Sequence, residues 1–316
     1  MSLQKSMTHD CDEECFGHKI VHRIVHKDRD SGFMGYTHAL SALAVVTLSL
    51  GIIGLAFGDL KNFLESTIGS SVFPVIILSI NAVLGSVMLN DLDNTSSRAR
   101  NDLGLFGVAI SGLFRGTSLV VQNTVRTKRD PAEPNPHRGF YHTLPGAALI
   151  SLLVLLGTRL DHEISLSMIP NQPVVTLGWL IGMVTVFILT HLALSTLAKE
   201  YMDKVRKSAL MGEVIAFGIS AVISIALLLS VPQGIDFWWL SVAIFIGMTI
   251  HVMGDIFTTA GAPIWFPIPI NGKMWWNVRL STIKAGGDFE NKILVKLLTV
   301  LSVIGIILTT IALIKM

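Results

Sequence analysis

Long apolar stretches separated by short polar segments make up most of the chain. A membrane crossing takes about 17–25 predominantly apolar residues, and seven stretches have that length: Tyr36–Phe57, Ile68–Leu89, Phe140–Leu160, Val175–Ala198, Ala209–Val231, Phe237–Phe257 and Ile293–Ile314. Hydrocarbon offers no partners for backbone amides, so spans without barrel-type alternation are helices. The shorter stretch Leu103–Phe114 is followed by Arg115 and predicts a re-entrant or interfacial segment. The pattern therefore predicts an all-α polytopic transmembrane bundle of about seven spans.

Composition agrees with a membrane protein and excludes several other classes. Hydrophobic residues make up 51% of the chain, charged residues only 15%, and the mean hydropathy is +0.62, whereas soluble domains carry about 25% charge. A net charge of +2 argues against a nucleic-acid binder. The two cysteines, Cys11 and Cys15, are too few for a disulfide scaffold. We divide the chain into a polar tail, 1–35, and a single membrane domain, 36–316.

The basic residues predict the orientation of these spans. Twenty of the 24 Lys and Arg residues fall in segments 1–35, 90–139, 199–208 and 258–292, which lie on one side of a seven-span arrangement. The opposite side holds only Lys61, Arg159 and Lys315. Because cytoplasmic loops are enriched in basic residues, we expect a multi-pass protein of the cytoplasmic (inner) membrane. Its N-terminus is predicted to be cytoplasmic and its C-terminus outside.

Histidines and aspartates gather at the predicted cytoplasmic ends of four of these spans. They are His38, Asp91, Asp93, His137, His142, His251 and Asp255. A helix dipole disfavours carboxylates at the C-terminal end of a helix, and a bound cation would offset that cost. At an N-terminal end the dipole disfavours protonated imidazole, so the histidine stays neutral and able to bind a metal. Mixed His and Asp ligands suit Zn²⁺ above all, and also Mn²⁺ or Fe²⁺. The placement predicts a divalent metal site at the cytoplasmic face.

Each group also has an ordinary structural interpretation when it is taken alone. His38 would serve as a polar anchor at the interface, and the two aspartates of 91–93 could pair with Arg98 or Arg100. His251 and Asp255, four residues apart on one helical face, could form a hydrogen bond between spans. The convergence of all of them on one membrane face favours the metal site.

At these residues the chain resembles the YdjM-like family, LexA-regulated membrane-bound proteins classed as metal-dependent hydrolases. The resemblance lies in four segments: 36–38 (YTH), 89–93 (LNDLD), 137–143 (HRGFYHT) and 251–261 (HVMGDIFTTAG). It implies that the seven His and Asp residues above form the metal and catalytic set. The chain departs from the family pattern at Asn90, where proline is usual, at Asn94, where histidine is common, and at Tyr141, where threonine is usual.

The leading hypothesis is a hydrolase that cleaves an ester or phosphoester of a small molecule or lipid with a metal-activated water. Arg138 would stabilise the developing anion, Asp255 would accept the proton, and Glu290 is a second candidate base. Two alternatives remain open: a metal-ion transporter, and a structural membrane protein with a decayed site. A transporter should place its ligands near the bilayer midplane, whereas these lie at one end.

Three further features carry smaller predictions. The stretch Pro267–Trp276 predicts a hairpin, because Asn271-Gly272 suits a type I′ turn between apolar arms, and its tryptophans would lie at headgroup depth. His191, in the middle of a span, predicts a hydrogen bond between helices. The tail residues offer either a second metal site or a cationic helix on the lipid surface: Cys11, Cys15, His18, His22 and His26.

Overall fold

A computed structural model describes residues 14–56, 72–95, 97–131, 137–164, 175–204, 209–230, 236–281 and 283–315. The main helices are α1 (Glu14–Ala56), α3 (Val72–Ser86), α4 (Arg98–Asp102), α5 (Gly104–Val125), α6 (Leu144–Gly157), α7 (Leu177–Lys204), α8 (Ala209–Ser230), α9 (Trp238–Ile256) and α10 (Val295–Lys315). Short helical turns occupy Asn90–Asp93 (η2), Phe140–His142 (η3) and Glu290–Leu294 (η4, a π-helical turn). The two-residue strands β1 (Glu163–Ile164) and β2 (Val175–Thr176) pair antiparallel.

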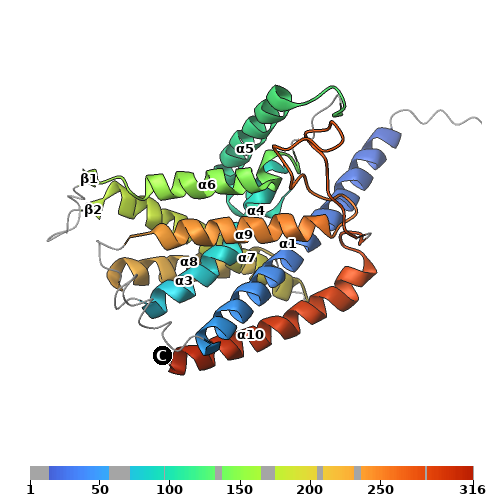
Figure 1. Cartoon of the computed structure of the whole chain (residues 1–316). Helices are drawn as coiled ribbons and strands as arrows, with labels where there is room; N and C mark the ends of the chain where they lie inside the picture. Colours follow the sequence, from blue (N-terminus) through green and yellow to red (C-terminus); the bar gives the residue numbers. More distant parts are fainter. Residues whose placement is uncertain are drawn as a thin grey trace, which may run out of the picture.

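The predicted all-α polytopic bundle is confirmed. Within the described residues, six helices are long and apolar enough to span a membrane: Gly35–Ala56, Pro74–Asp93, Gly104–Val125, Leu177–Ala198, Trp238–Ile256 and Glu290–Lys315. Helix α3 packs against both α7 and α9, α6 packs on α9, and α8 packs on α7. Helices α1 and α10 run side by side along one flank (Figure 1). Helix α1 begins inside the polar tail and continues unbroken into the first span, and the division into two domains stays a prediction.

Two predicted apolar segments differ in length from their helices. Helix α5 has 22 residues and continues well past Phe114, because Arg115 lies on its exposed face and leaves the backbone hydrogen bonds undisturbed. Helix α6 has only 14 residues and begins at Leu144 rather than Phe140. The Thr143 hydroxyl accepts a hydrogen bond from the Gly146 amide, 3.1 Å away, and this N-cap fixes the start of α6.

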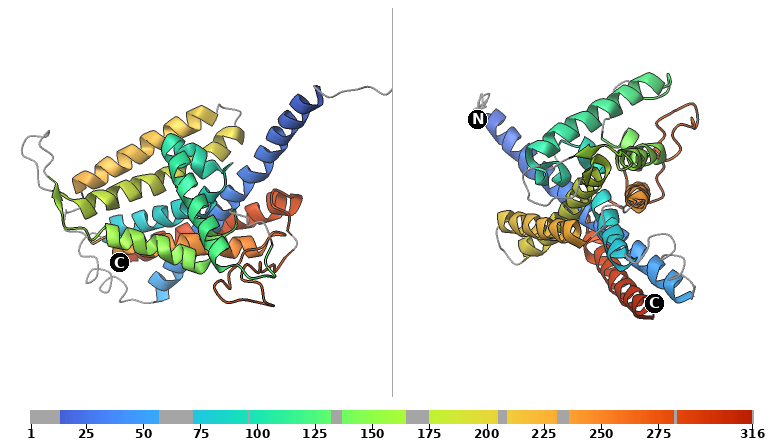
Figure 2. Two further views of the ribbon diagram at one scale, coloured as in Figure 1. Left: turned by 90° about the horizontal axis from the view of Figure 1, so that it is seen from above. Right: turned by 90° about the vertical axis from the view of Figure 1, so that its left-hand side faces the viewer.

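Helix α5 runs across the other helices instead of alongside them (Figure 2). Its buried face consists of small and polar residues together with one phenylalanine: Gly107, Ser111, Phe114, Ser118 and Gln122. Apart from Arg115 and the polar residues of its last turn, its exposed face is apolar, with Leu105, Leu113 and Val120 all more than half exposed. This distribution inverts the pattern of a soluble helix. It fits an apolar surrounding. Because Gly104–Val125 is long and apolar enough to span a membrane, the expectation that this segment is too short to cross is wrong, and its re-entrant or interfacial placement stays a prediction.

The predicted hairpin turn at Asn271-Gly272 is confirmed. Ile270 and Lys273 exchange two backbone hydrogen bonds of 2.9 Å each, and the two central residues have φ values of 52° and 73°. Positive φ at both positions is the requirement of a type I′ turn. The turn lies against the loop after α5, because the Thr127 hydroxyl donates to the Gly272 carbonyl at 2.6 Å.

Asp130 joins the hairpin to this loop. Its carboxylate accepts hydrogen bonds from the amides of Thr127, Met274 and Trp275 at 2.7–3.1 Å. Burial by itself raises the pKa of Asp130, but the hydrogen bonds that its ionised form accepts outweigh that effect, and the net result is a lowered pKa.

The contribution of Asp130 to hairpin docking should depend on pH. A carboxyl whose pKa is lowered on folding stabilises the folded state above its unfolded pKa, which is ordinarily 3.8, and this stabilisation is lost as pH falls through the folded value. Asp130→Asn should therefore remove the docking at neutral pH. We expect faster hydrogen exchange at the amides of Met274 and Trp275 in this variant at pH 7. Unchanged exchange would contradict the role of Asp130.

Candidate metal centre

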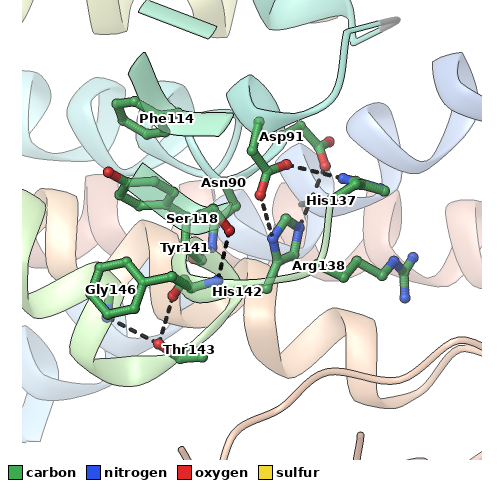
Figure 3. A network of polar contacts seen from close by, with 12 residues as sticks. Asn90, Asp91, Phe114, Ser118, His137, Arg138, Tyr141, His142, Thr143 and Gly146 are labelled. Carbon is green, nitrogen blue, oxygen red and sulfur yellow. Dashed lines mark hydrogen bonds and ion pairs between the residues drawn. The ribbon is translucent and has the colours of Figure 1, made fainter. Parts of the chain in front are cut away.

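Four elements distant in sequence bring their His and Asp residues to one end of the bundle. Helix α1 supplies His38, and the η2 turn after α3 supplies Asp91 and Asp93. The segment before α6 supplies His137 and His142, and the last turns of α9 supply His251 and Asp255. Part of this cluster is drawn in Figure 3, where His142 points at Asp91. The residues converge because α1, α3, α6 and α9 pack around one another.

At the middle of the cluster, histidine nitrogens alternate with aspartate oxygens. Nε2 of His142 lies 3.7 Å from Oδ1 of Asp91 and 3.6 Å from Oδ2 of Asp255. Nε2 of His251 lies 3.6 Å from each of the same two oxygens. Ligand atoms held about 2.1 Å from one ion in a tetrahedral arrangement would be about 3.4 Å apart. The observed separations are therefore close to those of a metal-ligand set.

The ligand atoms fall into two adjoining groups of three. One comprises His38, His251 and Asp255, and the other comprises Asp91, His137 and His142. Within each group the ligand atoms lie within 4.8 Å of one another. The rings of His38 and His251 are stacked with their centroids 4.0 Å apart. This arrangement could hold one ion in each group or a single ion between them.

Several ligand atoms of this cluster are buried without a hydrogen bond. Among the residues that the structure describes, Nε2 of His142 and Oδ2 of Asp255 are two such atoms. His142, His251 and Asp255 are each no more than 1% exposed. Buried polar atoms are normally paired. A cation bound between these nitrogen and oxygen atoms would supply the partner that each of them lacks.

Asp93 occupies a different position from the other predicted ligands. Its Oδ1 lies 3.1 Å from Nδ1 of His137, and its Oδ2 lies 3.5 Å from Nδ1 of His142. Asp93 thus contacts the His142 nitrogen opposite to the one that faces Asp91 and Asp255, and it belongs to neither group of three. A carboxylate behind a ligating histidine fixes its orientation and raises its basicity. The sequence spacing gave no means of separating this role from that of Asp91.

Two of the departures from the family pattern have structural roles beside the cluster. The Asn90 side chain donates to the Tyr141 carbonyl at 2.7 Å and so ties η2 to η3 (Figure 3). The Tyr141 ring stacks on Phe114 with centroids 4.1 Å apart, and its hydroxyl lies 2.6 Å from that of Thr117. Tyr141 therefore packs toward α5 and leaves the His and Asp cluster clear.

Arg138 connects the segment before α6 to the end of α9. Its guanidinium lies 3.2 Å from Oδ1 of Asp255 and donates to the Thr258 hydroxyl and the Gly261 carbonyl at 3.1 and 3.0 Å. Its backbone has a φ of 61°, a left-handed conformation uncommon outside glycine. Such a conformation persists where surrounding contacts over-determine it. The sequence contains no signal for this conformation.

Glu290 and His191 lie outside the two groups of three. Glu290 is buried in the η4 turn that precedes α10 and lines a cavity that His38 also lines. Nε2 of His191 lies 3.2 Å from the Asp102 carbonyl, so its predicted hydrogen bond between helices is confirmed. In the predicted tail site, Cys11 falls outside the described residues, and for Cys15, His18, His22 and His26 only the helical backbone is described.

Comparison with protein families places the chain beside a known membrane family. The model of the family described as YdjM inner membrane protein matches residues 33–200, slightly more than half of the chain. The chain belongs to the YdjM family. The match includes the segments that carry His38, Asp91, Asp93, His137 and His142. It ends before α9, so His251 and Asp255 join the cluster on the geometry of this chain. No curated protein and no solved structure matches the chain.

Proposed function

We propose that this YdjM-family protein is a membrane-embedded, metal-dependent hydrolase of an ester or phosphoester. The observation that carries the proposal is the largely buried His and Asp cluster at the end of a membrane bundle, in which atoms such as Nε2 of His142 and Oδ2 of Asp255 have no hydrogen bond. Ionisable residues at the end of an apolar bundle are costly and are kept for function. His38, His251 and Asp255, with Asp91, His137 and His142, would hold a divalent ion, zinc in the first place.

The residues around the cluster suit hydrolytic chemistry. A bound divalent ion would lower the pKa of a coordinated water and polarise the scissile bond. The Arg138 guanidinium, 3.2 Å from Asp255, would stabilise negative charge that develops on the substrate. Asp255 would accept the proton, and Asp93 would keep the His137 and His142 rings oriented with Nε2 toward the ion. Glu290, in the wall of the neighbouring cavity, would contact the substrate.

The test is metal-dependent cleavage by the purified full chain. Protein in detergent is stripped with a chelator, reloaded with Zn²⁺, Mn²⁺ or Fe²⁺, and offered p-nitrophenyl acetate, p-nitrophenyl phosphate and bis-p-nitrophenyl phosphate. We expect release of p-nitrophenol from one bond class, lost on stripping and restored on reloading. The Arg138→Gln variant should bind metal but cleave about 100-fold more slowly. Metal binding without cleavage of any substrate would refute the hydrolase.

The position of the ligands separates hydrolysis from metal transport. A transporter carries its ligands near the bilayer midplane, on broken helices, whereas this cluster lies at the ends of α3 and α9. Proteoliposomes containing the chain should therefore take up no more Zn²⁺ than empty vesicles do. Uptake that is lost in an Asp91→Asn variant would instead favour the transporter.

Asp93→Asn gives a graded test of the orienting role. The amide keeps the volume of the carboxylate but removes the charge that faces Nδ1 of His137 and His142. Loss of such an outer partner typically weakens metal binding about 10–100-fold. We expect a weakening in this range in a zinc competition titration with a chromophoric chelator. An affinity equal to that of the wild type would show that Asp93 does not orient the histidines.

A further inference from the structure

A cavity of about 290 Å³ adjoins the metal cluster on its α1 side. Its walls come from α1 (His38 and Ser41), the last turn of α9 and its C-cap (Gly254 and Phe257) and the η4 turn before α10 (Glu290 and Leu294). His38 is shared, because it belongs both to the cavity wall and to one group of candidate ligands. A molecule in this cavity would therefore lie directly beside the proposed metal centre.

The surface beside the cavity includes exposed apolar side chains at the ends of candidate membrane-spanning helices. Phe257 is 48% exposed and Ile293 is 54% exposed, and both α9 and the segment that contains α10 are candidate spans. Exposed apolar side chains on spanning helices face the acyl chains of the bilayer. The cavity can thus receive a molecule from the lipid phase next to it.

The cavity also contains polar groups without a partner. Within the described part of the chain, the Thr37 hydroxyl and Oε1 of Glu290 are buried and make no hydrogen bond, although Oε2 of Glu290 accepts from the Gly286 amide at 2.7 Å. Glu290 is only 2% exposed. A buried polar atom without a partner costs free energy. Two of them in the wall of one cavity indicate that a polar part of a ligand supplies the missing bonds.

The backbone at this wall is itself irregular. Glu290–Leu294 forms a π-helical turn immediately before α10. Single π-helical turns inside α-helices are rare and occur frequently at functional sites. Here the turn carries both Glu290, which offers the unpaired oxygen, and Leu294, which offers an apolar surface to the same cavity.

We propose that the cavity binds one acyl chain of a membrane lipid, with the polar backbone of that lipid at Thr37 and Glu290 and its scissile linkage beside His38. The volume lies near the lower end of the roughly 300–1,000 Å³ of ligand sites, which suits part of a single chain and excludes two. This proposal rests on the proposed hydrolase function and specifies its substrate class. The substrate would enter sideways from the bilayer.

Photolabelling in nanodiscs tests the cavity directly. The full chain is placed in dioleoylphosphatidylcholine containing a phosphatidylglycerol with a diazirine on one acyl chain, irradiated, digested and mapped by mass spectrometry. Thr37 and Thr258, at 7% and 6% exposed, are shielded from bulk lipid. Labels on these two cavity residues therefore show that a lipid acyl chain lies inside the cavity. We expect such labels, in addition to labels on the exposed face of α8.

Filling the cavity provides the decisive comparison. The double variant Ser41→Phe, Leu294→Trp should reduce labelling at Thr37 and Thr258 about tenfold relative to α8, equivalent to a penalty of about 1.4 kcal/mol. The matched control, Leu297→Trp, enlarges a side chain that is 53% exposed on the same helix and should leave the labelling unchanged. Absence of label at both threonines, or equal labelling in the filled variant, would overturn the proposal.

The metal and cleavage assays keep this result separate from the hydrolase proposal. Labelling is repeated on chelator-stripped protein. We expect the lipid acyl chain to remain in the cavity, because the walls of the cavity are formed by packed helices and not by the metal. Cavity labelling without cleavage of any offered substrate would leave the lipid site standing and refute the hydrolase. Metal-dependent cleavage of the soluble p-nitrophenyl substrates without cavity labelling would support the hydrolase and refute the lipid site.

Discussion

Replacing His251 and Asp255 together by alanine is expected to abolish metal binding by the purified chain. Each group of candidate ligands depends on this pair: both residues belong to one group, and both contact His142 or Asp91 of the other at 3.6 Å. Loss of an outer partner alone weakens metal binding about 10–100-fold, so loss of two direct ligands should exceed 100-fold. The measurement is the metal-to-protein ratio by elemental analysis after gel filtration.

The control for this variant is His191→Ala. His191 is also a buried histidine on a candidate spanning helix, but its hydrogen-bond partner is the Asp102 carbonyl, and it belongs to neither group of candidate ligands. We expect His191→Ala to keep the metal content of the wild type. The isosteric single variant Asp255→Asn guards against misfolding, because it retains the volume of the carboxylate. Equal metal content in the double variant and the wild type would refute the site.

Gly85→Ala is expected to destabilise the bundle by about 3 kcal/mol, the upper end of the usual overpacking penalty. A Cβ at this position would lie 2.0 Å from the Leu189 carbonyl oxygen and 2.6 Å from its Cα. Those atoms are backbone atoms of α7, so no side-chain rotation can relieve the overlap. Small residues allow this close approach of spanning helices. The expected result is a lower midpoint in thermal unfolding of the detergent-solubilised protein.

Gly112→Ala is the matched control for the packing prediction. Gly112 lies on α5, and a Cβ added there would have no atom within 4 Å. Alanine is favoured over glycine inside a helix by about 1 kcal/mol, so this variant should be unchanged or slightly more stable. If Gly85→Ala and Gly112→Ala unfold at the same temperature, the close contact of α3 and α7 is wrong.

Most of the predicted membrane helices follow directly from the sequence, and the errors have local causes. Bilayer thickness sets the length of a span, so the stretches around α1, α7 and α9 could be read from apolar runs. The apolar pattern predicts too short a helix at α5 because Arg115 interrupts it, although Arg115 lies on the exposed face and the helix continues to Val125. The same pattern predicts too early a start for α6, because the apolar run includes Phe140 and Tyr141, whereas the Thr143 cap begins the helix after them.

The seven candidate ligands could also be named from the sequence, because charged and imidazole groups at the ends of apolar runs are few. Their individual roles could not. Asp91 and Asp93 are two residues apart and chemically identical, yet one contacts Nε2 of His142 and the other contacts Nδ1. That difference depends on how the η2 turn is rotated, which Asn90 fixes through its hydrogen bond to Tyr141.

The sequence by itself determined the membrane setting, the helical class and the residues able to bind a metal, because each depends on composition and on spacing along one segment. Only the tertiary structure decided which ligand atoms face one another, where Arg138 donates, and that an apolar cavity with an unpaired Glu290 oxygen adjoins His38. These features arise between helices that are up to 250 residues apart in the chain. Their geometry is set by the packing of side chains and the close approach of backbones, neither of which a one-dimensional pattern contains.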